Sequence, residues 1–336
     1  MAIRVAVIGA GSWGTTVASL ACVNAPTILW ARRPELAAAL NREHRNGEYL
    51  PEFTLPEQLV ATHSMEEAVA SADVVVMGVP SHGFRIVLEE AAPHVRPWVP
   101  VVSLAKGLER GTLLRMSEVV GQVLPGHPVA VLTGPNLAKE IMGGQPAASV
   151  VATTDDVIAR ELQRIFTNEH LRVYTNHDLI GCEIAGVVKN VLAIASGMAD
   201  GMGYGDNTRA TLVTRGLHEL ARLGVAIGGE PLTFAGLAGM GDLIATCSSR
   251  HSRNHSVGYR LGKGQSIATI MDEMKMVAEG VMSSPSVLEL ARRHGIDMPL
   301  VEGVVGVCHR NRPATEVVRR IMEREAGAEM AGLSER

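Results

Sequence analysis

A single lysine lies inside a long and otherwise apolar stretch of the chain. Lys189 stands in the segment from Ala185 to Ile194, whose other residues are almost all small or aliphatic. Burying an unpaired lysine in such a segment is costly, so Lys189 should line a cleft or meet a partner. Loss of solvation lowers the pKa of a lysine toward the range that suits acid–base catalysis. Lys189 is therefore a candidate acid–base residue, the alternative being a lysine at the helix rim whose ammonium group reaches water.

Two more charged residues stand where they could serve the same chemistry. Asp242 ends the turn that begins at Gly239, and it could orient an ammonium group such as that of Lys189 or, equally, cap a helix. Lys106 follows the apolar run Val99–Leu104, which has the pattern of a buried strand. Ligands bind at the carboxyl ends of the strands in open parallel sheets, so Lys106 is a candidate ligand contact, with an ordinary solvated loop lysine as the alternative.

The stretch from Thr246 to Asn254 is rich in groups that bind anions. It reads Thr-Cys-Ser-Ser-Arg-His-Ser-Arg-Asn. Its hydroxyls, its amide and its two arginines, without any acid, suit a phosphate or another anion, and a solvated loop is the alternative. His251 and His255 are four residues apart, but no third ligand lies nearby in the sequence, so we expect no metal site.

A glycine-rich turn near the N-terminus has the pattern of a dinucleotide site. The β-branched run Val5–Ile8 is typical of a buried strand, and it leads into Gly9-Ala10-Gly11-Ser12-Trp13-Gly14 and then into a helix. In this motif Gly9 permits the tight turn, Gly11 lets the backbone approach a pyrophosphate, and Gly14 lets helix and strand pack closely. Amide groups at the start of the helix then bind the phosphates. A tight strand-to-helix turn without a ligand is the alternative.

The second predicted strand, Thr27–Trp30, is followed by Ala31-Arg32-Arg33. An NAD-selective site usually has an acid near this point, where it binds the ribose 2′-hydroxyl. The arginines Arg32 and Arg33 suit a 2′-phosphate instead. We therefore expect the cofactor to be NADPH or NADH, with a site that accepts NADP.

Strands and helices alternate through the first half of the chain. Beyond the two strands named above, the apolar runs predict strands at Asp73–Val79, Val99–Leu104, Val129–Thr133, Ala147–Ala152 and Leu171–Tyr174, with helices at Glu35–Arg45, Thr112–Val123 and Asp156–Phe166. This alternation is typical of an α/β Rossmann-type, doubly wound parallel sheet. We assign residues 1–178 to an NAD(P)-binding domain of this type.

After about Asp178 the strand pattern stops. The spacing of apolar residues predicts helices at Cys182–Met198, Thr208–Leu223, Ile267–Lys275, Val281–His294 and Thr315–Arg324, with glycine-rich loops at Gly197–Gly205, Gly236–Gly241 and Gly262–Gly264. Residues 179–336 should form a mostly α-helical substrate and catalytic domain with a polar C-terminal tail at Glu325–Arg336. A cleft between two such domains is a favoured place for a substrate.

The composition excludes several classes of protein. The 336 residues suffice for two domains, and a net charge of −4 argues against a nucleic-acid partner or a polybasic membrane anchor. The four cysteines are far apart, which argues against a disulfide framework and fits a reducing cytoplasm. The first strand begins almost at Met1, and no uncharged apolar run approaches membrane-spanning length. We therefore expect a cytoplasmic protein with neither a signal peptide nor a membrane-inserted segment.

Seven motifs stand in the order expected of a known family: Gly9–Thr15, Ala105–Gly107, Gly134–Asn136, Val188–Asn190, Gly239–Asp242, Ser252–Asn254 and Val277–Gly280. From the first strand to about residue 310, the chain resembles the bacterial NAD(P)-dependent glycerol-3-phosphate dehydrogenases. The resemblance implies reversible hydride transfer between NAD(P)H and dihydroxyacetone phosphate, giving sn-glycerol 3-phosphate for phospholipid synthesis. By analogy it also implies a homodimer.

The resemblance assigns roles to individual residues, with Lys189 as the proton donor and acceptor. Substrate contacts would come from Lys106, Gly134, Asn136, Asp242, Ser252, Arg253 and Asn254. Beyond the three glycines of the dinucleotide motif, cofactor contacts would come from Ser12, Trp13, Arg32, Arg33, Lys106, Ala138, Arg253, Val277 and Glu279. The chain departs from the family at Asn136, where Ser or Thr is usual, and the amide is larger than either hydroxyl-bearing side chain.

Two rival interpretations stand beside this one. A dehydrogenase of the β-hydroxyacid or 6-phosphogluconate type also carries a lysine on the first helix after its Rossmann domain, but it oxidises a carboxylate-bearing substrate. A non-catalytic dinucleotide sensor would use the cleft for a partner protein. Lys106 and the motif Ser252–Asn254 favour a phosphate over a carboxylate substrate, and a buried Lys189 weighs against the sensor.

Overall fold

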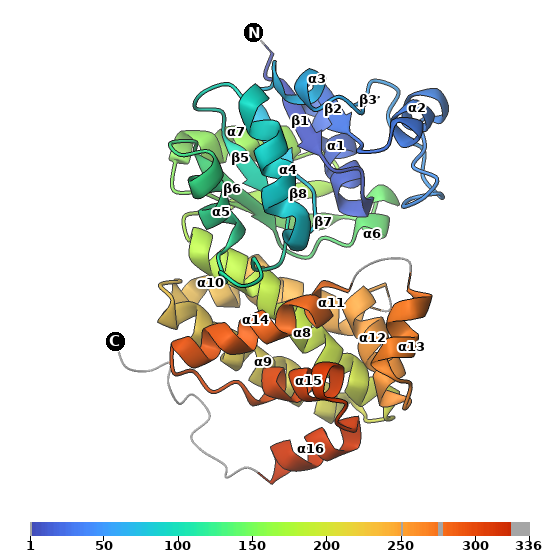
Figure 1. The fold of residues 1–336 in the computed structure, drawn as a ribbon, viewed down its shortest axis with the longest axis vertical. Helices are drawn as coiled ribbons and strands as arrows, with labels where there is room; N and C mark the ends of the chain where they lie inside the picture. Colours follow the sequence, from blue (N-terminus) through green and yellow to red (C-terminus); the bar gives the residue numbers. More distant parts are fainter. Residues whose placement is uncertain (1, 250, 275–277, 324–336) are drawn as a thin grey trace. The chain divides into compact units, whose positions relative to one another are not determined.

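The computed structural model describes residues 2–249, 251–274 and 278–323, and Figure 1 shows the course of the chain. The predicted polar tail Glu325–Arg336 lies outside the described residues. The chain forms two compact units. The first consists of Met1–Ala105 with Leu114–Leu179, and the second of Lys106–Leu113 with Ile180–Arg336. A short excursion that begins at Lys106 therefore belongs to the second unit, although both of its flanks lie in the first.

The first unit is built on one eight-stranded sheet. Its strands are β1 (Val5–Ile8), β2 (Thr27–Trp30), β3 (Val60–Thr62), β4 (Val74–Met77), β5 (Val101–Ser103), β6 (Val129–Thr133), β7 (Ala147–Ala152) and β8 (Leu171–Asn176). Their order across the sheet is β3-β2-β1-β4-β5-β6-β7-β8. The sequence predicted seven of these strands and missed β3, which has only three residues.

Helices cover both faces of this sheet, as the doubly wound class requires. They are α1 (Ser12–Asn24), α2 (Pro34–Glu43), α3 (Met65–Val69), α4 (Phe84–Ala91), α5 (Met116–Val123), α6 (Ala138–Met142) and α7 (Asp156–Phe166), with short 3-10 turns η1 (Ser81–Gly83) and η2 (Ala92–His94). In β1, Val5 and Val7 face a core shared with α1, α2 and α7, whereas Ala6 and Ile8 face a core shared with α3, α4 and α5. Both faces of the strand are buried, which explains its continuous apolar run.

The sheet departs from the predicted parallel order at one place. β6 and β7 are antiparallel, with Val131 opposite Ala152, while the other neighbouring strands are parallel. A parallel return needs a crossover that carries the chain back along the strand. The link between β6 and β7 contains only the five-residue helix α6, so the chain re-enters the sheet from the end at which it left.

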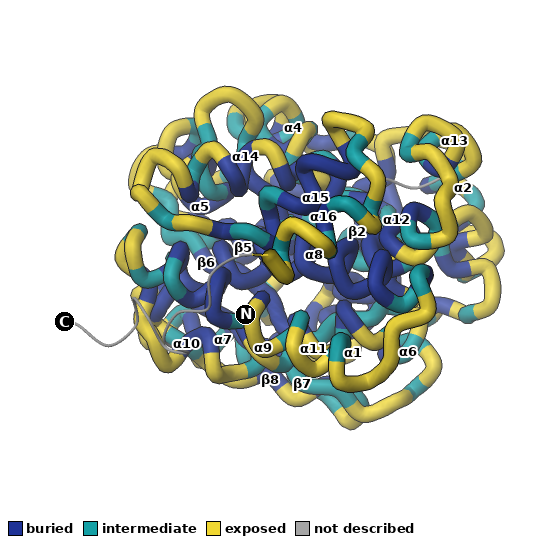
Figure 2. The backbone as a smooth tube through the Cα atoms, turned by 90° about the horizontal axis from the view of Figure 1, so that it is seen from below, coloured by how far each residue is buried: buried dark blue, intermediate teal, exposed yellow. Residues whose placement is uncertain are grey.

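Among the described residues of the second unit, the regular elements are all helices. Its elements are α8 (Leu179–Gly201), α9 (Asp206–Ala226), α10 (Pro231–Ala235), the π-helical turn η3 (Leu237–Gly241), α11 (Asp242–Ser248), α12 (Arg253–Gly262), α13 (Ile267–Glu273), α14 (Glu279–Arg293), α15 (Pro299–Arg310) and α16 (Ala314–Met322). Apolar side chains from most of these helices form one core around α8. Figure 2 shows the buried residues of the tube in dark blue.

The helix α8 is the apolar centre of this core. By length and composition alone it could cross a membrane, but 89% of its most apolar window is buried inside the structure. The sequence analysis excluded only uncharged apolar runs of membrane-spanning length. The helix α8 is not such a run, because it carries Glu183 and Lys189, both of them buried. Its apolar character is that of the central helix of a folded core.

Four glycines form a close helix crossing, and three of them, Gly197, Gly201 and Gly262, were predicted to lie in loops. Gly197 and Gly201 lie in α8, and Gly258 and Gly262 lie in α12, in each case four residues apart. A Cβ atom at any of them would lie 2.1, 2.2 or 2.3 Å from a backbone oxygen of the other helix. The predictions of loops at Gly197–Gly205 and at Gly262–Gly264 were therefore wrong at these positions. Glycine is needed here because the two backbones touch, not because the chain turns. The predicted loop Gly236–Gly241 is likewise mostly helical, because it forms η3.

Candidate active site

The centre of the candidate site is a buried carboxylate held between two lysines. Asp242, the first residue of α11, is 1% exposed. Its Oδ2 lies 2.7 Å from the Lys106 Nζ, and its Oδ1 lies 2.9 Å from the Lys189 Nζ. The Lys189 ammonium also donates to the Thr246 hydroxyl at 2.7 Å, and that hydroxyl donates to Asp242 Oδ1 at 3.2 Å. All four side chains belong to the second unit, because Lys106 lies in the excursion described above.

Burial and neighbouring charges shift the protonation of this cluster. Burial lowers the pKa of Lys189 to about 8, with Lys106 acting in the same direction and Asp242 opposing it. Burial alone would raise the pKa of Asp242, but the two ammonium groups outweigh it and hold that pKa below its usual value. Asp242 therefore stays ionised at neutral pH, while Lys189 can exchange a proton near neutrality.

A chain of amides fixes the elements around the cluster. Asn190, next to Lys189 on α8, donates to the backbone oxygen of Lys106 at 3.3 Å and accepts from the Asn254 amide at 3.0 Å. The Asn254 side-chain oxygen accepts from the Gly280 backbone N–H at 2.9 Å. These bonds tie the Lys106 excursion, α8, α12 and α14 together. They pair buried polar groups that would otherwise be costly.

The predicted anion-binding stretch contains the start of a helix. Ser252 is the N-cap of α12, where its hydroxyl accepts from the His255 backbone N–H at 3.2 Å, and Arg253 and Asn254 form the first turn. Arg253 is exposed and Asn254 is buried. Backbone amides and the helix dipole at such a terminus favour an anion, and the arginine adds a positive charge.

Glu279, predicted to contact the cofactor, is the first residue of α14 and is half-buried. Burial raises the pKa of its carboxyl, and the charge of Arg253, followed by those of Lys106 and Lys189, opposes this rise. Glu279 thus belongs electrostatically to the same group of charges. The predicted cofactor contact Val277 lies outside the described residues.

The glycine-rich turn of the first unit fits a dinucleotide. Gly9 has a φ of +113°, and a Cβ there would lie 2.7 Å from the Gly78 oxygen. A Cβ at Gly14 would lie 1.9 Å from the Gly9 oxygen, so both glycines are required by packing. A Cβ at Gly11 would have no neighbour within 4 Å. That open space lies at the N-terminus of α1, where free amides and the helix dipole favour a pyrophosphate.

Four further predicted cofactor residues of the first unit, Ser12, Trp13, Arg32 and Arg33, lie near this turn or after β2. Ser12 and Trp13 begin α1, and the buried indole Nε1 of Trp13 has no hydrogen-bond partner among the described residues. Arg32 and Arg33 follow β2 and are both exposed. Arg33 is the N-cap of α2 and forms an ion pair with Glu48. Glu48 thus places a carboxylate next to Arg33, although no acid directly follows β2 in the sequence.

Three predicted residues follow β6 in the first unit. Gly134 has a φ of +122° directly after the strand, and Ala138 is the first residue of α6. The Asn136 side-chain oxygen accepts from the Ser149 hydroxyl, and its Nδ2 is buried without a partner among the described residues.

Two residues of the central cluster were not proposed from the sequence as single contacts. Thr246 stood only within the anion-binding stretch, although its place four residues after Asp242 puts both on one face of α11. Asn190 was named only as part of the motif Val188–Asn190, without a role of its own. Across the described ranges, no group of three or more His, Cys, Asp or Glu residues could hold a metal ion.

Comparison with known proteins identifies the family. Residues 4–159 match the model of the NAD-dependent glycerol-3-phosphate dehydrogenase N-terminus, and residues 178–319 match that of its C-terminus. The chain belongs to this family. It is 58% identical over 329 residues to glycerol-3-phosphate dehydrogenase [NAD(P)+] 2 of Sphingopyxis alaskensis, covering 98% of this chain and 99% of that protein. It is 49% identical to the Mycobacterium avium enzyme of the same family, covering 98% and 97%.

Solved structures of this family have the same fold. Glycerol-3-phosphate dehydrogenase from Coxiella burnetii superposes with a TM-score of 0.92 at 35% identity, covering 96% of this chain and 99% of that one. A ketopantoate reductase from Ralstonia eutropha, with a TM-score of 0.58 at 17% identity, shares the fold alone. The predicted fold class, family and NAD(P)-dependent oxidoreductase class are confirmed.

Proposed function

We propose that this chain reversibly reduces dihydroxyacetone phosphate to sn-glycerol 3-phosphate with NAD(P)H. The observation that supports this most directly is the buried group of Lys106, Asp242 and Lys189 in a chain of the glycerol-3-phosphate dehydrogenase family. When bound, the nicotinamide cofactor supplies the hydride for reduction or takes it up in oxidation.

Lys189 is the proton donor and acceptor of this reaction. As the substrate carbonyl is reduced, its C=O electron pair moves onto the oxygen, and the Lys189 ammonium transfers a proton to that oxygen. The lysine is left as a neutral amine, a state that its pKa of about 8 makes accessible. In the reverse direction the amine accepts the hydroxyl proton. Before transfer, the ammonium stabilises the developing negative charge.

Asp242 and Thr246 orient the Lys189 ammonium, because each contacts its Nζ. Lys106 adds a second positive charge next to Asp242, so the group carries two cations and one anion. An excess of one positive charge suits a substrate that is itself an anion. Lys106 also contacts the substrate in this proposal.

The substrate phosphate binds at Ser252, Arg253 and Asn254, with Gly134 and Asn136 as further substrate contacts. The first turn of α12 supports this assignment through its amides and the Arg253 guanidinium. A phosphate remote from the reacting carbon supplies binding energy that orients the carbonyl.

The cofactor contacts are the residues predicted from the sequence: Gly9, Gly11, Ser12, Trp13, Gly14, Arg32, Arg33, Lys106, Ala138, Arg253, Val277 and Glu279. We also propose that residues 1–178 bind the dinucleotide and that residues 179–336, together with Lys106, bind the substrate. We further propose that the product is used in phospholipid synthesis. The protein would be cytoplasmic, without a membrane-inserted segment, and would form a homodimer.

The test follows the consumption of NADPH by absorbance with dihydroxyacetone phosphate and, in parallel, with a 2-keto acid of similar size. We expect the protein to turn over dihydroxyacetone phosphate and not the keto acid. Preference for the keto acid would favour a dehydrogenase of carboxylate substrates. Binding of NADPH without turnover of either compound would favour a dinucleotide sensor.

A further inference from the structure

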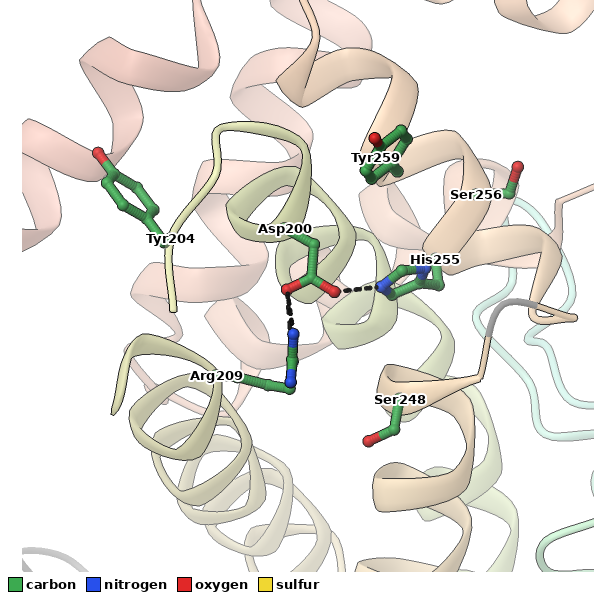
Figure 3. A pocket seen from close by; sticks show the side chains of 7 residues that line it. All are labelled: Asp200, Tyr204, Arg209, Ser248, His255, Ser256 and Tyr259. Atoms are coloured by element: carbon green, nitrogen blue, oxygen red, sulfur yellow. Dashed lines mark hydrogen bonds and ion pairs between the residues drawn. The ribbon is translucent and has the colours of Figure 1, made fainter. Parts of the chain in front are cut away.

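A second polar group lies on the face of α12 that carries His255. The His255 Nε2 lies 2.9 Å from Asp200 Oδ2, and the Arg209 guanidinium reaches Asp200 Oδ1 through Nη2 at 3.1 Å and Nε at 3.4 Å. Figure 3 shows Asp200, from the end of α8, between Arg209 of α9 and His255 of α12. These three residues line a cavity of about 650 Å³. None of them was assigned a role in the reaction.

The carboxylate of Asp200 is held at both oxygens. Arg209 contacts Oδ1 with two of its nitrogens, which leaves Oδ2 for the imidazole. The Asp200 side chain is 18% exposed and that of His255 is 9% exposed, so water competes little for this bond. A hydrogen bond to a carboxylate is stronger in such surroundings than at an open surface, whether the imidazole is neutral or charged.

His255 is directly next to the proposed phosphate-binding residues. Its backbone N–H donates to Ser252, and its neighbour Asn254 is bonded to Asn190 on α8. Asp200 stands ten residues after Asn190 on the same helix, a separation of about 15 Å along the axis. Two consecutive residues of α12 are therefore tied to two widely separated points of α8.

The glycine crossing between α8 and α12 makes these two bonds important. Gly197 and Gly258 bring the backbones together but have no side chains that could resist sliding or rotation of one helix on the other. The side-chain bonds at Asn254 and His255 supply that restraint. The first turn of α12 is thus bonded to α8 at two separate points.

We propose that Asp200, acting through His255, is a positioning residue that holds the Ser252–Asn254 turn in the geometry that binds the substrate phosphate. The inference rests on the proposed function of that turn. Arg209 supports it by fixing the carboxylate of Asp200. Without the bond to Asp200, the start of α12 shifts and the phosphate contacts are misaligned, while Lys189 and Asp242 on α8 and α11 keep their own hydrogen bonds.

The test compares Asp200→Ala and Asp200→Asn with the control Asp206→Asn. Asp206 contacts the same arginine at 2.8 Å, but its side chain is 95% exposed and it does not touch His255. Kinetics are measured with dihydroxyacetone phosphate and with unphosphorylated dihydroxyacetone. Binding of sn-glycerol 3-phosphate is measured by calorimetry, and circular dichroism and melting curves report folding.

We expect Asp200→Ala to raise KM for dihydroxyacetone phosphate and Kd for sn-glycerol 3-phosphate by roughly tenfold or more, with kcat changed by less than about threefold. Dihydroxyacetone, which has no phosphate, should be used equally well by variant and wild type. Asp200→Asn retains an oxygen that accepts from His255 but lacks the charge, so its effect should be intermediate. Asp206→Asn should match the wild type.

Equal losses with both substrates, a fall in kcat at constant KM, or the same change in Asp206→Asn would overturn the positioning role. If Asp200→Ala does not fold, Asp200→Asn decides between these outcomes. A wild-type protein that turned over neither compound would contradict the proposed function instead, and the two failures are thus distinct.

Discussion

One carboxylate shared by two ammonium groups gives the site its chemical character. Asp242 satisfies Lys106 and Lys189 at once, so the cluster tolerates the loss of a proton from Lys189 without leaving Asp242 unpaired. A buried carboxylate without any counter-ion would be strongly unfavourable. The arrangement therefore suits a lysine that alternates between its charged and neutral forms.

The pKa of Lys189 predicts opposite pH dependences for the two directions of the reaction. Ketone reduction needs the protonated lysine, so its rate should be constant below about pH 8 and fall as the pH rises through that value. Alcohol oxidation needs the neutral amine and should rise over the same interval. Measuring kcat/KM against pH in both directions tests this, and profiles of the same sign would contradict it.

Replacing Lys189 by Ala should remove the chemical step and leave the fold intact. We expect kcat to fall by about 10²- to 10⁴-fold or more, because both proton transfer and charge stabilisation are lost. The melting temperature should not fall, because a desolvated charge is removed and Lys106 still pairs with Asp242. A variant that kept most of its kcat would give Lys189 a structural role.

Arg32 and Arg33 should determine how well NADPH is used. Changing both to Ala should raise KM for NADPH by roughly a hundredfold or more, since charged hydrogen bonds contribute about 1.5–3 kcal/mol each, and should affect NADH much less. Arg33 is already paired with Glu48, so we expect Arg32→Ala alone to have the larger share of the effect. Steady-state kinetics with both cofactors test this, and equal losses for NADPH and NADH would contradict it.

At the scale of elements, the close crossing of α8 and α12 depends on the absence of side chains. In Gly258→Ala the new Cβ would lie 2.1 Å from the Ile194 oxygen, so the helices must separate. We expect the free energy of unfolding to fall by about 1–3 kcal/mol or more, as for other overpacked cores. Urea denaturation provides the measurement.

The matched control is Gly121→Ala, at an exposed helical glycine of α5 whose Cβ would have no neighbour within 4 Å. There the substitution should stabilise by about 0.5–1 kcal/mol, because alanine is the better helix former. A gain of similar size in both variants would mean that helix propensity, and not contact between the two backbones, determines the change in unfolding free energy.

Elements with a clear periodic or continuous apolar pattern could be predicted from the sequence. The prediction failed where tertiary contacts determine the local structure. The strands β1, β2, β6 and β7 were predicted with their observed bounds because strands buried on both faces form continuous apolar runs. Gly197 and Gly201 of α8 were assigned to a loop because nothing in a single sequence separates a glycine that turns from one that touches another helix. The antiparallel pairing of β6 with β7 had no local signal either.

The same limit applies to the site. Lys189 was predicted as a candidate because a lysine in an apolar helix is conspicuous, and Asp242 because a carboxylate follows a glycine turn. The role of Thr246 between them, and the bond between His255 and Asp200, depend on which helices meet. Sequence spacing gives contacts within a helix, whereas these contacts join different helices.

At the scale of the whole molecule, a buried acid makes stability depend on pH. Burial raises the pKa of Glu219, on α9, to about 7, although its carboxyl accepts from the Leu300 and Val301 amides at the start of α15. A raised folded-state pKa means that stability is greatest below the ordinary value and is lost as the pH rises toward 7. The loss should be of order 3 kcal/mol at most.

Glu219→Gln should remove this dependence, because an amide does not ionise. The difference in unfolding free energy between variant and wild type should therefore shift in favour of the variant between pH 4.5, the ordinary pKa of the carboxyl, and about pH 7, its raised pKa in the folded protein. Urea denaturation at several pH values measures it. Parallel curves for the two proteins would contradict the assignment.

The chain passes between its two compact units at Lys106, returns at Leu114, and leaves the first unit again after Leu179. This path has a consequence for protein engineering and for gene recombination. A chimera joined near residue 179 would not exchange two self-contained modules, because Lys106 would come from one parent and Asp242 from the other. Recombinants between distant homologues should therefore keep activity only when the 106–113 segment is transplanted together with the C-terminal half.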